Sequence, residues 1–136
     1  MAISHGRRKS KGSAAERELI HKFWAVGWAA VRAAGSGSSQ FPSPDILVGT
    51  IGRKIALEIK VTKDKKKYFT GEEIDNLVYF SEKFGAEAMV AIKFDRKGTY
   101  FVPISSLTKT PASYVISLEE AIEKGKNFEE LLSLLP

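Results

Sequence analysis

Residues 44–60 of the 136-residue chain have the sequence PDILVGTIGRKIALEIK. Two apolar runs, residues 44–48 and 55–60, lie on either side of the short segment Gly49-Thr50-Ile51-Gly52. Apolar runs joined by so short a glycine-containing segment predict a β-hairpin. Both runs carry charged residues that a buried strand does not usually hold.

Asp45 opens the first run, and Glu58 and Lys60 interrupt the second. Side chains alternate faces along a strand, so Glu58 and Lys60 point to one face, about 6.6 Å apart. The apolar residues around them point into a core on the other face: Leu57, Ile59 and Val61. Charged residues are seldom buried unless they are paired or bind a metal. Two carboxylates from paired strands beside a lysine form an oxygen-ligand cation site, which suits phosphodiester hydrolysis.

The alternative interpretation is a salt bridge on the solvated face of an antiparallel sheet. Glu-X-Lys is a common tripeptide, and strand alternation alone places polar residues outward. The Pro44-Asp45 pair at the start of the preceding strand favours the catalytic interpretation.

The length and composition indicate one soluble globular domain with room for a core. No cysteine is present, which excludes disulfides and thiolate metal sites within these residues. His5 and His21 have no partner at ligand spacing, so a metal would be held by oxygen. We see no signal peptide and no apolar stretch that could span a membrane, and we expect a cytoplasmic, nucleoid-associated protein.

The net charge of +5 is divided unevenly along the chain. Residues 1–67 hold 14 Lys and Arg against 5 Asp and Glu, or +9, whereas residues 68–136 hold 7 against 11, or −4. The candidate site lies in the positive half, which suits a polyanionic substrate. A solvated lysine-rich surface would give the same numbers.

Residues 1–12 form a basic segment of low hydrophobicity, and we expect a flexible N-terminal arm followed by a single nuclease domain over residues 13–136. The arm is interpreted as binding phosphates, with a solvated terminus as the alternative. Its candidate DNA-binding residues are Arg7, Arg8, Lys9 and Lys11.

A second basic cluster follows the hairpin. We predict that Lys63, Lys65, Lys66 and Lys67 contact the DNA backbone. The next residues, Tyr68 and Phe69, would either stack on bases or, as we favour, fold onto the core.

The remaining pattern predicts helices alternating with strands. Ser13 with Glu16, Thr70 with Glu73, Ser117 with Glu120, and Asn127 with Glu130 have capping-box spacing. The expected helices cover residues 13–26, 70–84, 118–124 and 128–134, and the expected further strands cover residues 28–33, 88–94, 99–103 and 114–116. This order predicts an α/β fold with a mixed central β-sheet flanked by α-helices.

Four motifs together resemble the archaeal Holliday junction resolvases, which belong to the restriction-endonuclease-like nucleases. They are Ala15-Glu16-Arg17-Glu18-Leu19, Ala30-Val31-Arg32-Ala33-Ala34-Gly35-Ser36, Pro44-Asp45-Ile46 and Glu58-Ile59-Lys60. The resemblance runs from about residue 12 to residue 94 and more loosely beyond. It implies a restriction-endonuclease-like fold.

The resemblance also implies a role for each matched residue. Asp45, Glu58 and the main-chain carbonyl of Ile59 would bind the metal, and Lys60 would lie beside the attacking water. Glu16 would be an additional acidic residue, either catalytic or a further metal ligand.

Two arginines and a serine complete the set that the resemblance implies. Arg17 and Arg32 would lie near the scissile phosphate, and Ser36 would lie in a loop beside the site. The cofactor would be Mg²⁺, one or two ions per site, with Mn²⁺ as a substitute.

The implied function is a structure-specific endonuclease that cuts four-way DNA junctions symmetrically near the branch point, in homologous recombination and DNA repair. The partners would be four-way junction DNA, a second copy of the chain in a homodimer and other recombination proteins. For the dimer interface, the acidic half offers Phe94, Phe101 and residues 131–135, which could equally be core. Two rival functions stay open: a related metal-dependent nuclease acting on a flap, mismatch or duplex end, and a non-catalytic DNA-structure binder.

Overall fold

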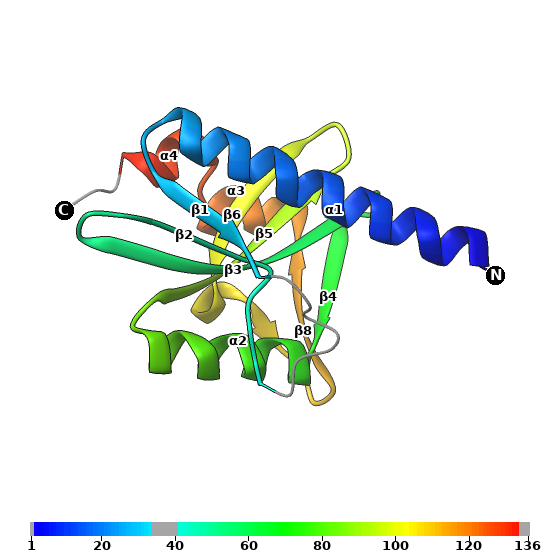
Figure 1. Cartoon of the computed structure of the whole chain (residues 1–136). Coiled ribbons are helices and arrows are strands. Elements are labelled where there is room, and N and C mark those ends of the chain that lie inside the picture. The colour runs from blue at the N-terminus through cyan, green and yellow to red at the C-terminus, as the bar shows by residue number, and fades with distance from the viewer. Residues whose placement is uncertain (1, 34–40, 134–136) are drawn as a thin grey trace.

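A computed structural model describes residues 2–33 and 41–133, with side chains from Gly12 onwards. The elements in chain order (Figure 1) are α1 (Ala2–Ala25), β1 (Ala29–Arg32), β2 (Ile46–Thr50), β3 (Arg53–Thr62), β4 (Lys66–Thr70), α2 (Gly71–Phe84), β5 (Glu87–Phe94), β6 (Gly98–Pro103), the 3₁₀ turn η1 (Ile104–Ser106), β7 (Thr108–Lys109), β8 (Ser113–Ser117), α3 (Leu118–Lys124) and α4 (Phe128–Leu132).

The central sheet has five strands in the order β1-β2-β3-β5-β6. Strands β3 and β5 are parallel, and the other neighbouring pairs are antiparallel. A parallel pair needs a long crossover connection, and β4 with α2 supplies it. The predicted α/β fold with a mixed sheet flanked by helices is therefore confirmed.

The sheet lies between two hydrophobic layers, so its central strands are buried on both faces. Helix α1 covers one face with Leu19 and Phe23, which pack with Leu57 and Ile59 of β3. Helix α2 lies on the opposite side of the sheet (Figure 1), and its Ile74 and Leu77 pack in the second layer. Glu58 and Lys60 alternate with Leu57 and Ile59, so they face the α2 side.

The predicted hairpin is formed by β2 and β3, with Thr50 opposite Arg53. The connecting loop is Ile51-Gly52, and Gly52 has a φ of 88°, a value that glycine adopts without strain. The strands extend further into the turn segment than the sequence predicted.

Three of the four predicted capping boxes are present, in each case with both reciprocal hydrogen bonds: Thr70 with Glu73, Ser117 with Glu120, and Asn127 with Glu130. Gly85 ends α2 in the left-handed region, as predicted.

The predicted helix start at Ser13 was wrong. Helix α1 begins at Ala2, so Ser13 lies inside it. No proline interrupts residues 2–12, and the Ser-Glu spacing of three that marks a helix start also occurs within helices. The basic segment thus continues α1, and its flexibility in solution stays a prediction.

The sequence analysis also missed β4. This strand pairs with β8 in a second sheet of order β4-β8-β7, which packs over the α2 layer. Phe69 is buried in that layer as favoured, but Tyr68 is 58% exposed, so its expected folding onto the core was wrong. The two side chains point to opposite faces because they are neighbours on a strand.

Three of the apolar residues considered for a dimer interface are core, and a fourth, Leu132, is partly buried against it. Phe94, Phe101 and Leu131 are at most 2% exposed within the single chain, and residues 134–135 lie outside the described residues. Over the described part of the chain, no helix is long and apolar enough to cross a membrane.

Candidate active site

Asp45 immediately precedes β2 and is fixed by main-chain hydrogen bonds on both sides. Its N–H donates to the Leu57 carbonyl at 2.9 Å, and its carbonyl accepts from the Ala33 N–H at 3.0 Å. Its carboxylate Oδ2 accepts from the Ile59 N–H at 2.7 Å. The carboxylate is therefore held against the Glu58-Ile59 segment of β3.

Glu58 and Lys60 lie where the charged face of β3 meets the start of α2. The Glu58 side chain is 16% exposed and the Lys60 side chain 26% exposed, so both are largely withdrawn from solvent. The Lys60 Nζ lies 3.7 Å from the Glu58 Oε2 and also pairs with the carboxylate of Glu73 in α2.

Burial shifts the two carboxyl groups toward the protonated form. Burial, followed by the charge of Asp45, raises the pKa of Glu58 to about 8. Burial likewise raises the pKa of Asp45, against the opposing hydrogen bond from Ile59. Two carboxylates that repel each other in a desolvated place are stabilised in their ionised form by a bound cation.

Lys60 stays a cation in this setting. Burial would lower the pKa of its ammonium group, but the hydrogen bond and charge of Glu73 and the charges of Glu58 and Asp45 outweigh burial and raise it. Lys60 is therefore suited to orient a water molecule or stabilise negative charge, and unsuited to accept a proton.

The donor set fits a hard divalent cation with few protein ligands. Within residues 2–33 and 41–133, no group of three or more His, Asp or Glu is clustered closely enough to hold a metal ion alone. Mg²⁺ commonly uses one or two carboxylates and keeps several waters, so the Asp45-Glu58 pair with the Ile59 carbonyl matches its preference.

Helix α1 brings a third carboxylate to the edge of this cluster. The Arg32 Nε in β1 donates to the Glu16 Oε1 at 2.8 Å, and the charge of Glu16 reaches Asp45 strongly enough to contribute to raising its pKa. Arg17 is exposed on the same helix. Glu16 and Arg32, from α1 and β1, thus form a pair on the Asp45 side of the Asp45-Glu58 pair.

Other predicted residues lie outside the described ones. Ser36 falls in residues 34–40, and the side chains of Arg7, Arg8, Lys9 and Lys11 belong to residues 2–11 of α1.

A basic groove of about 730 Å³ begins at the site. It is lined by Gly12, Ile59, Lys60, Val61, Thr62, Lys63, Asp64 and Lys67. Among the described residues, none of the four predicted lysines after β3 forms an ion pair, and Lys63, Lys65 and Lys66 are exposed. Among its described lining residues, Lys63 and Lys67 therefore give the groove more positive charge than its one unpaired acidic residue, Asp64, offsets.

Glu73 is the site residue that the sequence analysis missed. Its position three residues after Thr70 explained it completely as a capping residue, so nothing in the pattern indicated a second contact. Only the packing of α2 on β3 shows that its carboxylate faces Lys60.

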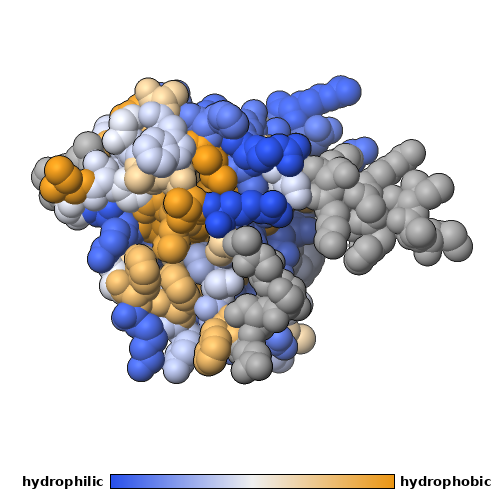
Figure 2. All heavy atoms as spheres, in the orientation of Figure 1, coloured by the Kyte–Doolittle hydropathy of each residue, from blue (hydrophilic) through white to orange (hydrophobic). Residues whose placement is uncertain are grey.

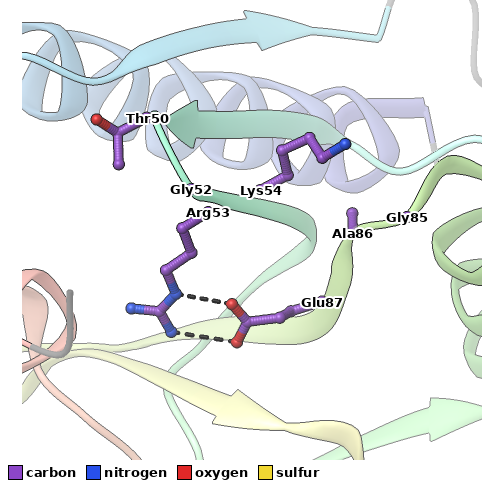
Figure 3. A pocket seen from close by; sticks show the side chains of 7 residues that line it. All are labelled: Thr50, Gly52, Arg53, Lys54, Gly85, Ala86 and Glu87. Atoms are coloured by element: carbon purple, nitrogen blue, oxygen red, sulfur yellow. Dashed lines mark hydrogen bonds and ion pairs between the residues drawn. The ribbon is translucent and has the colours of Figure 1, made fainter. Parts of the chain in front are cut away.

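A second hollow, of about 710 Å³, lies at the other end of β3 (Figure 3). Arg53 dominates it by pairing with Glu87 through two nitrogens at 2.7 and 3.2 Å and by donating to the Leu131 carbonyl at 3.1 Å. These bonds tie the starts of β3 and β5 to α4. Because the arginine charge is already compensated, we assign the contact a structural role.

The mixed sheet, with an Asp-Glu-Lys set on its hairpin and a helix that carries Glu16 packed on it, defines a protein of the restriction-endonuclease-like class. A sequence model of the archaeal Holliday junction resolvase family matches residues 7–135. The chain belongs to that family, as its motifs predicted.

Named relatives agree with this assignment. The crossover junction endodeoxyribonuclease Hjc of Archaeoglobus fulgidus is 42% identical over 129 residues, which cover 90% of this chain and 95% of that protein. The Hjc protein of Methanocaldococcus jannaschii is 35% identical over 106 residues, 78% and 75% of the two chains. The solved structure of Archaeoglobus fulgidus Hjc, described as a Holliday junction resolvase, matches with a TM-score of 0.83 and 37% identity, over 88% of this chain and 98% of that one.

Proposed function

We propose that this protein is a structure-specific endodeoxyribonuclease that resolves four-way DNA junctions by hydrolysing one phosphodiester in each of two opposed strands. The observation that carries the proposal is the partly buried Asp45-Glu58 pair beside the Lys60 ammonium, in a chain of the resolvase family. We place its role in homologous recombination and DNA repair, close to the nucleoid and with other recombination proteins.

The proposed cofactor is Mg²⁺, one or two ions per site, with Mn²⁺ as a substitute. Asp45, Glu58 and the Ile59 carbonyl would hold it, and Glu16 would help to hold a second ion or a metal-bound water. A divalent cation bound there would polarise the scissile phosphate and offset charge on the leaving oxygen.

Lys60 orients the water whose oxygen forms the new bond to phosphorus while the bond from phosphorus to the sugar oxygen breaks. Its ammonium is held at the mouth of the groove by the two glutamates around it. An ammonium near the reacting phosphate also stabilises the negative charge that grows during attack.

The two arginines bind the phosphate. Arg32 is 55% exposed beside Glu16, and Arg17 lies exposed on the facing helix. A guanidinium holds phosphate oxygens through two parallel hydrogen bonds, which a lysine does not reproduce. Ser36 is proposed to join them.

The basic groove tracks the DNA backbone away from the cut. Lys63 and Lys67 line it and contact phosphates there, and their exposed sequence neighbours Lys65 and Lys66 contact phosphates as well. Arg7, Arg8, Lys9 and Lys11 are proposed to bind further phosphates. Each phosphate neutralised releases counterions, so binding weakens steeply with salt.

The substrate also argues for a homodimer. A four-way junction has approximate two-fold symmetry, and two matched cuts are most simply made by two identical sites related by the same axis.

The test is a cleavage assay on a labelled four-way junction, with linear duplex of the same sequence as competitor and with Mg²⁺ present or chelated. We expect paired symmetric cuts near the branch point that require Mg²⁺ and that duplex does not compete away. Mg²⁺-dependent cutting of duplex, flaps or mismatches in place of the junction would overturn the junction assignment while keeping the chemistry. Tight junction binding without cutting in any divalent metal would overturn the enzymatic assignment.

A further inference from the structure

Glu73 in the first turn of α2 uses both oxygens of its carboxylate. Its Oε1 accepts the Thr70 N–H at 2.9 Å, and its own N–H donates to the Thr70 Oγ1 at 3.0 Å. Its Oε2 accepts from the Lys60 Nζ. One side chain therefore joins the cap of a helix to the lysine of the proposed active site.

We propose that Glu73 is a positioning residue that holds the Lys60 ammonium in place for catalysis and away from the metal-binding carboxylates. This inference rests on the proposed function of the Asp45-Glu58-Lys60 site.

The geometry shows why Lys60 needs such a partner. Lysine carries its charge on a flexible four-carbon stem, so the position of the ammonium is set by what it binds. Its nearest other carboxylate is Glu58, at 3.7 Å from the Nζ, which is beyond hydrogen-bond distance. Without Glu73, attraction would draw the ammonium onto Glu58 or Asp45, where it would occupy oxygens that a cation needs.

The helix makes Glu73 a rigid anchor. A carboxylate in the first turn of a helix is favoured by the helix dipole, and the hydrogen bond that its Oε1 accepts from the Thr70 main-chain N–H fixes its rotamer. Helix α2 packs on β3 and β5 through buried Ile74 and Leu77, so the carboxylate is set at a fixed height over β3.

The other capping boxes provide an internal comparison. Glu120 caps α3, and its Oε2 lies 3.7 Å from the Nζ of Lys124 in the same helix. Glu130 caps α4. Among the described residues, neither of them contacts the hairpin site. Capping alone accounts for those two glutamates, whereas it leaves the Lys60 contact of Glu73 unexplained.

The experiment compares single-turnover cleavage of a four-way junction, at saturating enzyme and Mg²⁺, with the junction Kd measured in Ca²⁺. For Glu73→Ala we expect the cleavage rate to fall about 10- to 100-fold, as a displaced catalytic group costs, with the Kd within about twofold of wild type. Glu73→Gln keeps one acceptor oxygen in place of two, so it can accept from Lys60 or from the Thr70 N–H but not from both, and it should recover only part of the rate.

Two further variants separate positioning from capping. Thr70→Ala removes the hydroxyl cap but not the Lys60 contact, so it should lower the melting temperature and leave the rate unchanged. In a Lys60→Ala background, Glu73→Ala should cause no further loss, because the group it positions is gone.

Several results would overturn the inference while leaving the proposed function intact. These are a wild-type rate for Glu73→Ala, an equal loss of rate in Thr70→Ala, and a full additional loss in the Lys60→Ala background. A Lys60→Ala protein that cleaves at the wild-type rate, or a wild-type protein that does not cleave, would instead refute the site on which the inference rests.

Discussion

Substituting Glu58 should abolish DNA cleavage without weakening DNA binding. Its carboxylate is a proposed metal ligand, and it is also a negative charge close to where phosphate must lie. We expect Glu58→Ala to reduce junction cleavage by about 1,000-fold or more, because several kcal/mol of metal stabilisation are lost at about tenfold per 1.4 kcal/mol. Gel-shift titration should show junction affinity unchanged or tighter. Loss of binding in parallel with cleavage would argue against the assignment.

The same residue should make the metal-free protein less stable as the pH rises. The pKa of Glu58 is about 8 in the folded chain against an ordinary value of 4.5, so between these pH values the folded state binds more protons than the unfolded state. The free energy of unfolding therefore falls through this window, at about 1.4 kcal/mol per pKa unit, or a few kcal/mol in total. The raised pKa of Asp45 acts in the same direction.

Denaturant unfolding in EDTA at pH 6, 7 and 8 measures this loss. Glu58→Gln, which does not titrate, should flatten the dependence, and Mg²⁺ should stabilise the wild-type protein more at pH 8 than at pH 6. Parallel pH curves for wild type and Glu58→Gln would contradict the prediction.

The central site residues were predictable from sequence because strand periodicity is short and regular. Asp45, Glu58 and Lys60 violate an apolar pattern, and alternation alone places the last two on one face. Glu73 was not predictable, since it satisfies a helix-capping pattern in full and its second contact depends on how α2 packs.

At the scale of elements, the helices with caps were predicted closely, whereas β4 was missed. Its sequence, KKYFT, begins in a run of lysines that indicates a solvated loop, and its pairing partner β8 lies more than 40 residues later in the chain. Strand formation there depends on a long-range partner, and local patterns do not report such partners.

The end of α3 depends on a close approach that only glycine permits. Gly125 has a φ of −98°, so its backbone is open to any residue, but a Cβ there would lie 2.6 Å from the Ala121 carbonyl oxygen and 2.9 Å from that of Phe101. We expect Gly125→Ala to destabilise the protein by about 1–3 kcal/mol, the usual cost of overpacking.

Thermal or urea unfolding checks this value, and Gly71→Ala at the start of α2 is the matched control. A Cβ at Gly71 meets nothing within 4 Å, so that change should be neutral or stabilise by up to about 1 kcal/mol. Equal changes in the free energy of unfolding for the two substitutions would show that the backbone around Gly125 accommodates a Cβ without strain.

At the scale of the whole molecule, the sheet is covered unequally. Among the described residues, helix α2 packs mainly on β3 and β5, and on the same face Leu47 of β2 is only partly buried beside the α2 layer. Val31 of β1 is 55% exposed there, opposite Leu47 of β2, and Phe84 at the end of α2 is 47% exposed. Figure 2 shows apolar side chains gathered where β1 and β2 reach the surface above α2.

This open apolar face is where we expect the second copy of the chain to bind. Phe94, Phe101 and Leu131, which were first considered for the interface, are core, and an exposed apolar surface of this kind commonly marks an interaction site. The adjoining site residue Arg32 lies on the same strand as Val31, so pairing through this face would fix the two sites relative to each other.

Val31→Lys tests the interface because two-fold symmetry brings the two introduced charges toward each other. Like charges placed together at an interface cost several kcal/mol, so the dimer should dissociate at least about 100-fold more readily. Ile122→Lys is the control, since Ile122 is 54% exposed on α3, which packs on β6 at the far edge of the sheet. Sedimentation velocity should find the Val31→Lys protein monomeric and the Ile122→Lys protein dimeric.

In the cleavage assay, Val31→Lys should release singly nicked junctions because its two sites no longer act together. A dimeric Val31→Lys protein beside a monomeric Ile122→Lys protein would move the interface to the α3 side of the molecule.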